Sequence, residues 1–187
     1  MILDLCGGTG SWAQPYRDRG YRVITVDPAG EPLDSVREDV RLWRPERGLR
    51  VHGVLAAPPC TALSVSGARW WAAKGEAQLR DALSIADACR RIVELVEPAW
   101  WALENPVGRL RHWHGPAVAT FQPWQYGDPY QKLTCLWGRF VMPAPTVAAR
   151  PEDVDTRIHR AAPGPGRARF RSMTPAGFAR AFCEANP

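Results

Sequence analysis

The sequence lacks any long hydrophobic run. None of its 187 residues belongs to an apolar stretch near the ~20 residues that a membrane-spanning helix needs. It begins almost at once with a short apolar segment, Ile2–Leu5, rather than with the basic and apolar regions of a secretory signal. We therefore expect a cytoplasmic protein with no membrane partner.

Paired cysteines are also missing. The five cysteines are odd in number and form no Cys-x-x-Cys pair, which argues against a disulfide framework and against a zinc site. We expect no bound metal. Each cysteine has to be judged from its own surroundings.

Acidic residues are absent from one part of a basic chain. The net charge is +5, and residues 156–183 contain six arginines, one histidine and no acid. Such a cluster is typical of a phosphate-binding surface. A solvated, arginine-rich tail is the alternative. The first hypothesis makes Arg167, Arg169 and Arg171 candidates for substrate contact.

The composition is that of one globular domain, with 45% hydrophobic and 23% charged residues. Apolar runs predict strands at residues 2–5, 21–26, 51–56, 100–103 and 133–137. Helical spacing predicts helices at 11–19, 76–96 and 175–185, the last with Thr174 as its N-cap. Proline and glycine predict an irregular connection over residues 142–169. The alternation of elements predicts an α/β fold with a doubly wound, mostly parallel sheet.

A glycine-rich turn follows the first predicted strand. Asp4-Leu5-Cys6 leads into Gly7, Gly8 and Gly10, and glycines let the backbone approach a ligand closely. Asp27 ends the second strand, where a ribose would lie. No phosphate-binding lysine accompanies the turn, which favours an adenosyl cofactor without phosphates. A tight turn with a purely structural role is the alternative.

Two further motifs end predicted strands. Pro58-Pro59-Cys60 presents a thiol on a rigid turn, and Glu104-Asn105-Pro106 presents a carboxyl group that can donate a proton. Both motifs fall at the strand ends where α/β proteins place their sites. Cys60 could instead be a buried structural cysteine, and Glu104 an ordinary carboxylate that caps a turn.

In their order along the chain, these motifs resemble the C5-cytosine DNA methyltransferase family. Arg171-Ser172-Met173-Thr174-Pro175 resembles the family's ninth motif, which is mostly structural. The resemblance implies a Rossmann-like methyltransferase fold and S-adenosylmethionine as the cofactor. It implies cofactor contacts from Asp4, Cys6, Gly7, Gly8, Gly10, Asp27, Asp39 and Pro58. It implies substrate contacts from Ser64, Arg69, Asn105 and Lys132, in addition to those from Arg167, Arg169 and Arg171.

The resemblance also implies the chemistry. Cys60 would add to C6 of a cytosine rotated out of its stack, Glu104 would assist at N3, and C5 would then take the methyl group. The enzyme would be a DNA (cytosine-5-)-methyltransferase with cytosine-containing DNA as its partner. Lys132 stands where the family has a Gln-x-Arg-x-Arg box, and a solvated lysine is the alternative there.

Two family features are missing. Residues 139–171, an Arg/Pro-rich and irregular insertion within the single domain 1–187, leave little room for a target-recognition domain. The chain therefore resembles a short, phage-type member of a family that serves restriction and modification. A homodimer or an accessory subunit could restore the missing surface. The family's tenth motif is also absent, and we expect the final helix to dock beside the first strand in its place.

Three alternatives stay open at this stage. The same chemistry could act on RNA, single-stranded DNA or a free nucleotide, because the recognition domain is short. A different one-carbon unit could be transferred with the same cofactor. The chain could also be a catalytically silent nucleic-acid-binding homologue. Binding to phosphates alone, however, needs neither Cys60 nor Glu104.

Overall fold

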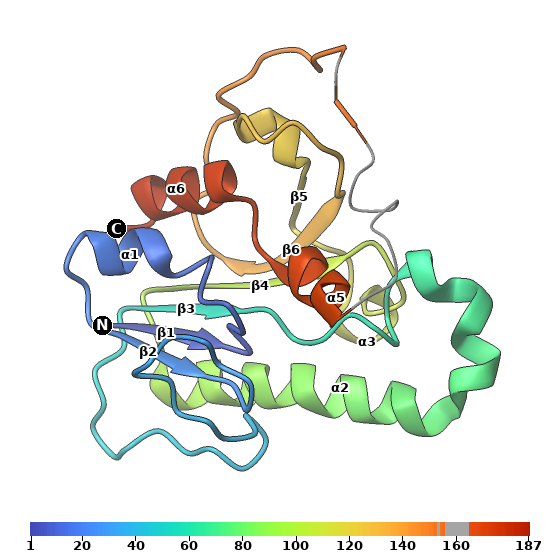
Figure 1. Ribbon diagram of the computed structural model, residues 1–187. Helices are drawn as coiled ribbons and strands as arrows, with labels where there is room; N and C mark the ends of the chain where they lie inside the picture. The colour runs from blue at the N-terminus through green and yellow to red at the C-terminus, as the bar shows by residue number, and fades with distance from the viewer. Residues whose placement is uncertain (153, 156–164) are drawn as a thin grey trace.

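A mostly parallel sheet forms the centre of the molecule. In this computed structural model, residues 1–152, 154–155 and 165–187 are described. Among them, six strands pair in the order β2-β1-β3-β4-β6-β5 (Figure 1). They are β1 (Ile2–Leu5), β2 (Val23–Val26), β3 (Gly53–Ala56), β4 (Trp100–Pro106), β5 (Ala119–Phe121) and β6 (Thr134–Arg139). The first four strands are parallel, whereas β6 runs antiparallel to β4 and β5. The carboxyl ends of β1, β3 and β4 therefore meet at one edge.

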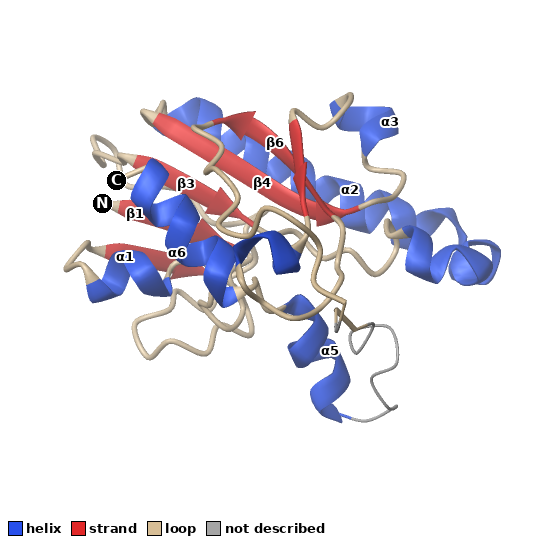
Figure 2. Cartoon of the chain, turned by 90° about the horizontal axis from the view of Figure 1, so that it is seen from above, coloured by secondary structure: helices blue, strands red, loops and turns tan. Residues whose placement is uncertain are grey.

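Helices cover both faces of the sheet. The long helix α2 (Trp71–Val96) lies on one face, and α1 (Gln14–Asp18) and α6 (Ala176–Ala185) lie together on the other (Figures 1 and 2). Shorter elements complete the described chain. They are the helices α3 (Arg111–His114) and α5 (Pro165–Ser172) and the 3-10 helices η1 (Val65–Trp70) and η2 (Pro123–Tyr126). The predicted doubly wound α/β fold is confirmed.

Alternating side chains of the strands pack into two separate hydrophobic cores, one on each face of the sheet. In β1, Leu3 packs in the core beneath α2, whereas Ile2 packs in the core beneath α1 and α6. Both faces of each central strand are buried, which explains why these strands read as continuous apolar runs rather than as alternating ones. The core beneath α6 is rich in aromatic residues. Its rings include Phe121 and Phe178, which stack with centroids 3.6 Å apart.

The final helix docks beside α1, over the sheet face next to the first strand. The Tyr16 hydroxyl donates a hydrogen bond to the Asn186 carbonyl oxygen over 2.9 Å. Asn186 also joins α6 to the chain after β6, because its side chain donates to the Val141 carbonyl and accepts from the Val141 N–H. The expected docking of the final helix is therefore found, with α1 as its direct neighbour.

Most element boundaries differ from the prediction by a few residues, and three differences bear on the site or its surroundings. Thr174 is not the N-cap of α6; Pro175 takes that position without a side-chain cap, and the Thr174 N–H donates to Ser11 Oγ. Helix α2 begins at Trp71 rather than at residue 76 and changes direction at Gly75, whose φ is 70°. The segment predicted to be irregular contains part of helix α5. Neither α5 nor β5 has enough apolar periodicity to be predicted.

A glycine contact in α6 gives a stability prediction. A Cβ on Gly177 would overlap the carbonyl oxygen of Tyr126 in η2. Gly177→Ala should therefore lower the free energy of unfolding by about 1 to 3 kcal/mol through overpacking. Gly166 is the matched control, because it is also helical and has nothing within 4 Å of a new Cβ. There alanine should stabilise by up to about 1 kcal/mol. Urea unfolding of both variants measures the opposite signs, and equal effects would contradict the packing argument.

Candidate active site

A pocket opens at the carboxyl ends of β1, β3 and β4. Its cavity volume is about 70 Å³, which is less than the ~300 Å³ or more that is usual for a ligand pocket. The segment before β6 and helix α5 also reach this edge, through Lys132 and Arg171. The residues that line the pocket are Asp4, Cys6, Gly7, Gly8, Ser11, Trp12, Ala57, Pro58, Pro59, Cys60, Glu104, Pro106, Lys132, Arg171, Ser172 and Thr174.

The Pro-Pro turn places Cys60 in this pocket. Asn105 ties the turn to the end of β4, because its amide nitrogen donates to the Pro58 carbonyl oxygen over 2.8 Å. The Cys60 carbonyl accepts the N–H groups of Leu63 and Ser64, each over 2.9 Å. The thiol is therefore held by a backbone that is bonded on both sides, and the two strand-end motifs form one unit.

Opposing effects act on the Cys60 thiol. Burial raises its pKa above the usual range, and the negative charge of Glu104 raises it further. Lys132 and Arg171 act in the other direction, since positive charges favour the thiolate. In the free protein the thiol form is favoured. A ligand that donates a hydrogen bond to Glu104 would offset part of the effect of this carboxylate on the thiol.

The carboxyl group of Glu104 is buried, and one of its two oxygen atoms has no hydrogen-bond partner among the described residues. Its side chain is 6% exposed, and Oε2 has no hydrogen-bond partner among the residues that the structure describes. An unpaired buried acceptor is costly unless a ligand satisfies it. The arrangement suits a ligand that brings an N–H donor to this oxygen.

Two cationic side chains complete this side of the pocket. Lys132 is 7% exposed, and its ammonium group donates to the Met173 carbonyl oxygen over 3.3 Å. Arg171 of α5 donates to Ser66 Oγ over 3.1 Å. Lys132 is therefore buried and is not the solvated strand-end lysine that the sequence left as an alternative. Helix α5 contacts the loop that follows Cys60.

The glycine-rich turn forms the opposite side. Cys6 adopts a left-handed backbone conformation with φ of 56°, and the Gly8 N–H donates to Asp27 Oδ2 over 3.0 Å. A Cβ on Gly7 would overlap the Asp4 carboxylate, so glycine is needed for this packing. Trp12 Nε1 is buried and has no partner within the described part of the chain. The turn can therefore accept a polar ligand through backbone groups and one free indole N–H.

Asp4 is the buried acid of the site. Burial raises its pKa to about 6, although Arg17 and the hydroxyl of Thr25 both favour the charged form. Arg17 donates to Thr25 Oγ1 over 2.7 Å, and Thr25 in turn donates to Asp4 over 3.2 Å. The carboxyl group is thus linked through Thr25 to a cation rather than paired with it directly.

This raised pKa predicts a pH-dependent stability difference. Because the folded pKa lies above the ordinary value of 3.8, the neutral carboxyl stabilises the fold at low pH, and this contribution is lost as the pH rises from about 4 through about 6. The loss amounts to about 3 kcal/mol at most. Asp4→Asn cannot titrate, so its stability relative to wild type should increase over that window. Urea unfolding at several pH values measures the difference. The exposed Asp18→Asn is the control, and a constant difference for Asp4→Asn would contradict the assignment.

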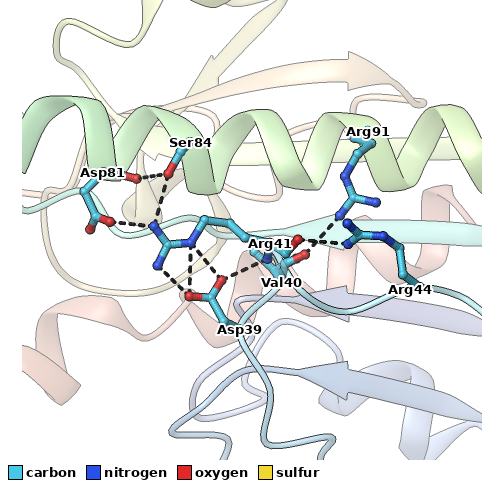
Figure 3. Close-up of polar contacts among 7 residues, drawn as sticks. All are labelled: Asp39, Val40, Arg41, Arg44, Asp81, Ser84 and Arg91. Atoms are coloured by element: carbon cyan, nitrogen blue, oxygen red, sulfur yellow. Dashed lines mark hydrogen bonds and ion pairs between the residues drawn. The ribbon is translucent and has the colours of Figure 1, made fainter.

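Asp39 has a different setting from the other candidate cofactor residues. Its carboxylate pairs with the Arg41 guanidinium, which lowers the Asp39 pKa (Figure 3). Arg41 also contacts Asp81 and Ser84 on α2 (Figure 3). This ion-pair network fastens the 39–44 segment to α2, so a cofactor would have to share the Asp39 carboxylate with Arg41. The proposed cofactor role of Asp39 stays a prediction.

The structure brings together more than half of the predicted site residues. Those that line the pocket are Asp4, Cys6, Gly7, Gly8, Pro58, Cys60, Glu104, Lys132 and Arg171. Those outside its lining are Gly10, Asp27, Asp39, Ser64, Arg69, Asn105 and Arg169. Arg169 instead pairs with Glu31 over 2.6 Å. Arg167 belongs to α5, but its side chain lies outside the described part of the structure.

Sequence reasoning missed several residues that line the pocket. Trp12 could have been noticed, because it follows the glycine turn directly. Ser172 and Thr174 lie in a motif that was expected to be only structural. They reach the pocket because the Thr174 N–H donates to Ser11 Oγ over 2.9 Å. No local pattern in the sequence predicts that long-range contact.

Comparisons with known proteins identify the fold of the chain but assign it to no family. No known protein family and no curated protein matches the sequence. A solved structure that matches is the crystal structure of a candidate DNA modification methyltransferase encoded within a prophage of E. coli. The TM-score is 0.53 at 15% sequence identity, over 80% of this chain and 51% of the other. The chain thus spans about half the length of that protein. It shares the Rossmann-like α/β fold of that structure.

No helix in the described ranges is both long and apolar enough to cross a membrane.

Proposed function

We propose that the protein transfers a methyl group from S-adenosylmethionine to C5 of a cytosine in DNA, through a covalent adduct with Cys60. The observation that carries this proposal is the convergence of Cys60, Glu104 and the glycine-rich turn on one pocket. A structural cysteine or a capping carboxylate would need no such neighbours. The likeness to a candidate DNA methyltransferase supports the choice of methyl transfer, since the two chains share a fold.

The residues around Cys60 act on the cytosine ring, and each has a different role. Cys60 forms a bond from sulfur to C6 of the cytosine, and the electrons of the C5–C6 double bond shift toward C5 and N3. Glu104 accepts a hydrogen bond from, or donates a proton to, the N3 side of the ring, which its unpartnered oxygen fits. Lys132 and Arg171 favour the thiolate form of Cys60. Once C5 carries the transferred methyl group, a base accepts the C5 proton, the electrons of that C–H bond restore the C5–C6 double bond, and the C6–sulfur bond breaks to release the Cys60 thiolate.

The residues on the turn side would hold the cofactor. S-adenosylmethionine supplies an electrophilic methyl group when it is bound. The turn from Cys6 to Gly8 offers backbone groups without obstruction by side chains, and Trp12 offers a free N–H. Asp27, fixed by the Gly8 N–H, could accept hydrogen bonds from ribose hydroxyls. These donors and acceptors fit an adenosyl group.

Label transfer combined with covalent trapping tests this function. The protein is incubated with tritiated S-adenosylmethionine and cytosine-containing DNA, in parallel with DNA that contains 5-fluorocytosine. We expect label on C5 of cytosine and a trapped protein–DNA adduct that mass spectrometry maps to Cys60, because fluorine at C5 blocks the final elimination. Cofactor binding without transfer to duplex DNA, single-stranded DNA or RNA would overturn the proposal.

A further inference from the structure

Three segments around the pocket contain no aspartate or glutamate, although the chain has 19 acids elsewhere. They are residues 61–75, which follow Cys60, residues 105–127, which follow Glu104, and residues 165–175, which include Arg171. Together they hold six arginines and one lysine.

Acids from elsewhere reach two of these segments, because Glu31 pairs with Arg169 and Asp87 lies 3.1 Å from His114. Arg69, Arg109 and Arg111 have no acidic partner among the residues that the structure describes, and unpaired arginines attract a polyanion. The pocket therefore opens among segments suited to phosphate groups.

Specific contacts join the first two segments into one surface. Ser64 and Gly108 form an antiparallel bridge, and the Arg109 N–H donates to the Leu63 carbonyl oxygen over 3.0 Å. Gly108 is required for this approach, because a Cβ there would overlap the same carbonyl. The Arg109 guanidinium also lies over the Trp71 ring, 4.4 Å from its centroid. The loop after Cys60 and the chain leading to α3 are thus joined by backbone and side-chain contacts.

The third segment borders the same loop. Arg171 of α5 bonds to Ser66 in η1 over 3.1 Å. In Figure 2, α3 and α5 lie on opposite sides of the start of α2. The second and third segments therefore lie on either side of the first, which contains the start of α2 (Figure 2).

Exposed indole rings stand on this surface. Trp70 is 54% and Trp113 51% exposed, whereas Trp12, Trp100 and Trp137 are buried in the core. The Arg69 guanidinium lies 5.2 Å from the Trp70 ring centroid. Exposed indoles beside arginines suit bases that stack on the rings while phosphates contact the cations. A duplex hides its base faces, so the match is to a single strand.

We propose that this indole–arginine surface, formed by Arg69, Trp70, Arg109, Arg111 and Trp113, binds single-stranded DNA beside the catalytic pocket. Bases next to the target stack on Trp70 and Trp113, and the arginines neutralise the backbone. A target that is already unpaired also needs less energy to enter the pocket. The identity of the target base rests on the proposed function, but the binding mode does not.

Fluorescence anisotropy with a labelled oligothymidylate tests the surface without the chemistry, because this probe contains no cytosine. We expect the single strand to bind more tightly than a duplex of the same length. Trp70→Ala and Trp113→Ala should each weaken binding about fivefold to a hundredfold. Trp→Phe variants should bind nearly as well as wild type, since a stacking face remains. Leu42→Ala, a change to an exposed apolar residue outside this surface, is the control.

The salt dependence gives a second measurement. Arg69→Gln should lower the slope of log K against log salt by about 0.7, the value for one phosphate contact on a single strand. Equal or tighter binding of the duplex or of oligouridylate, or unchanged binding by both Trp→Ala variants, would overturn the proposal. If the single strand binds as expected but no methyl group is transferred to cytosine, the result would support the single-strand surface and contradict the proposed function.

Discussion

Cys60→Ser is expected to abolish methyl transfer and the covalent DNA adduct together. A serine hydroxyl at this position is a far weaker nucleophile than a thiolate, and neither Lys132 nor Arg171 can ionise it at neutral pH. Loss of an essential nucleophile typically lowers kcat by about four orders of magnitude or more. Label transfer and trapping by 5-fluorocytosine measure the two losses. Cofactor binding, measured by calorimetry, should stay close to that of wild type.

Cys183→Ser is the matched control for this result. Cys183 is also a free thiol whose pKa is raised by burial, but it lies in α6 and does not line the pocket. This variant should keep its transfer activity at temperatures below its unfolding transition. Substantial transfer by Cys60→Ser, or an adduct that maps to another cysteine, would show that the thiol on the Pro-Pro turn is not the nucleophile.

The ends of the central strands could be predicted because their signals are local. Each of β1, β3 and β4 is a short buried run. Residues that break the strand follow β1 and β3 at once, whereas Glu104, Asn105 and Pro106 are the last residues of β4 itself. Parallel strands bring such ends to one edge by topology alone. Cys60 and Glu104 could therefore be placed together before any coordinates were known. The antiparallel β5 has only three residues and no comparable signal.

The rest of the site depends on contacts between residues far apart in the sequence. Arg171 reaches the pocket because α5 crosses the strand ends, and α5 is too polar for its periodicity to predict a packed helix. Asp39 was predicted to contact the cofactor, and no sequence pattern predicted that Arg41 pairs with its carboxylate and links it to α2. Sequence patterns report which groups are present. Which partner each group selects is decided by the tertiary fold.

Glu104→Gln is expected to change two activities of the site in opposite directions. The negative charge of Glu104 raises the pKa of Cys60, so its removal should lower that pKa and speed alkylation of the thiol by iodoacetamide at neutral pH. Methyl transfer should fall by about 10²- to 10⁴-fold, the usual contribution of a positioned acid or base. Glutamine has nearly the same shape, so loss of packing should contribute little.

The free energy of unfolding separates a catalytic role from a structural one. If Glu104 only capped the end of β4, the variant would loosen the site, and Cys60 alkylation would rise because the thiol became more accessible, but the free energy of unfolding would fall. A catalytic role predicts the same two rate changes with little change in the free energy of unfolding. Alkylation mapped to Cys60 by mass spectrometry, beside transfer rates and urea unfolding, distinguishes the two cases. Glu46→Gln makes the same charge change at an exposed residue and should alter neither rate. A Glu104→Gln variant with faster alkylation and normal transfer would keep the electrostatic coupling and remove Glu104 from the chemistry.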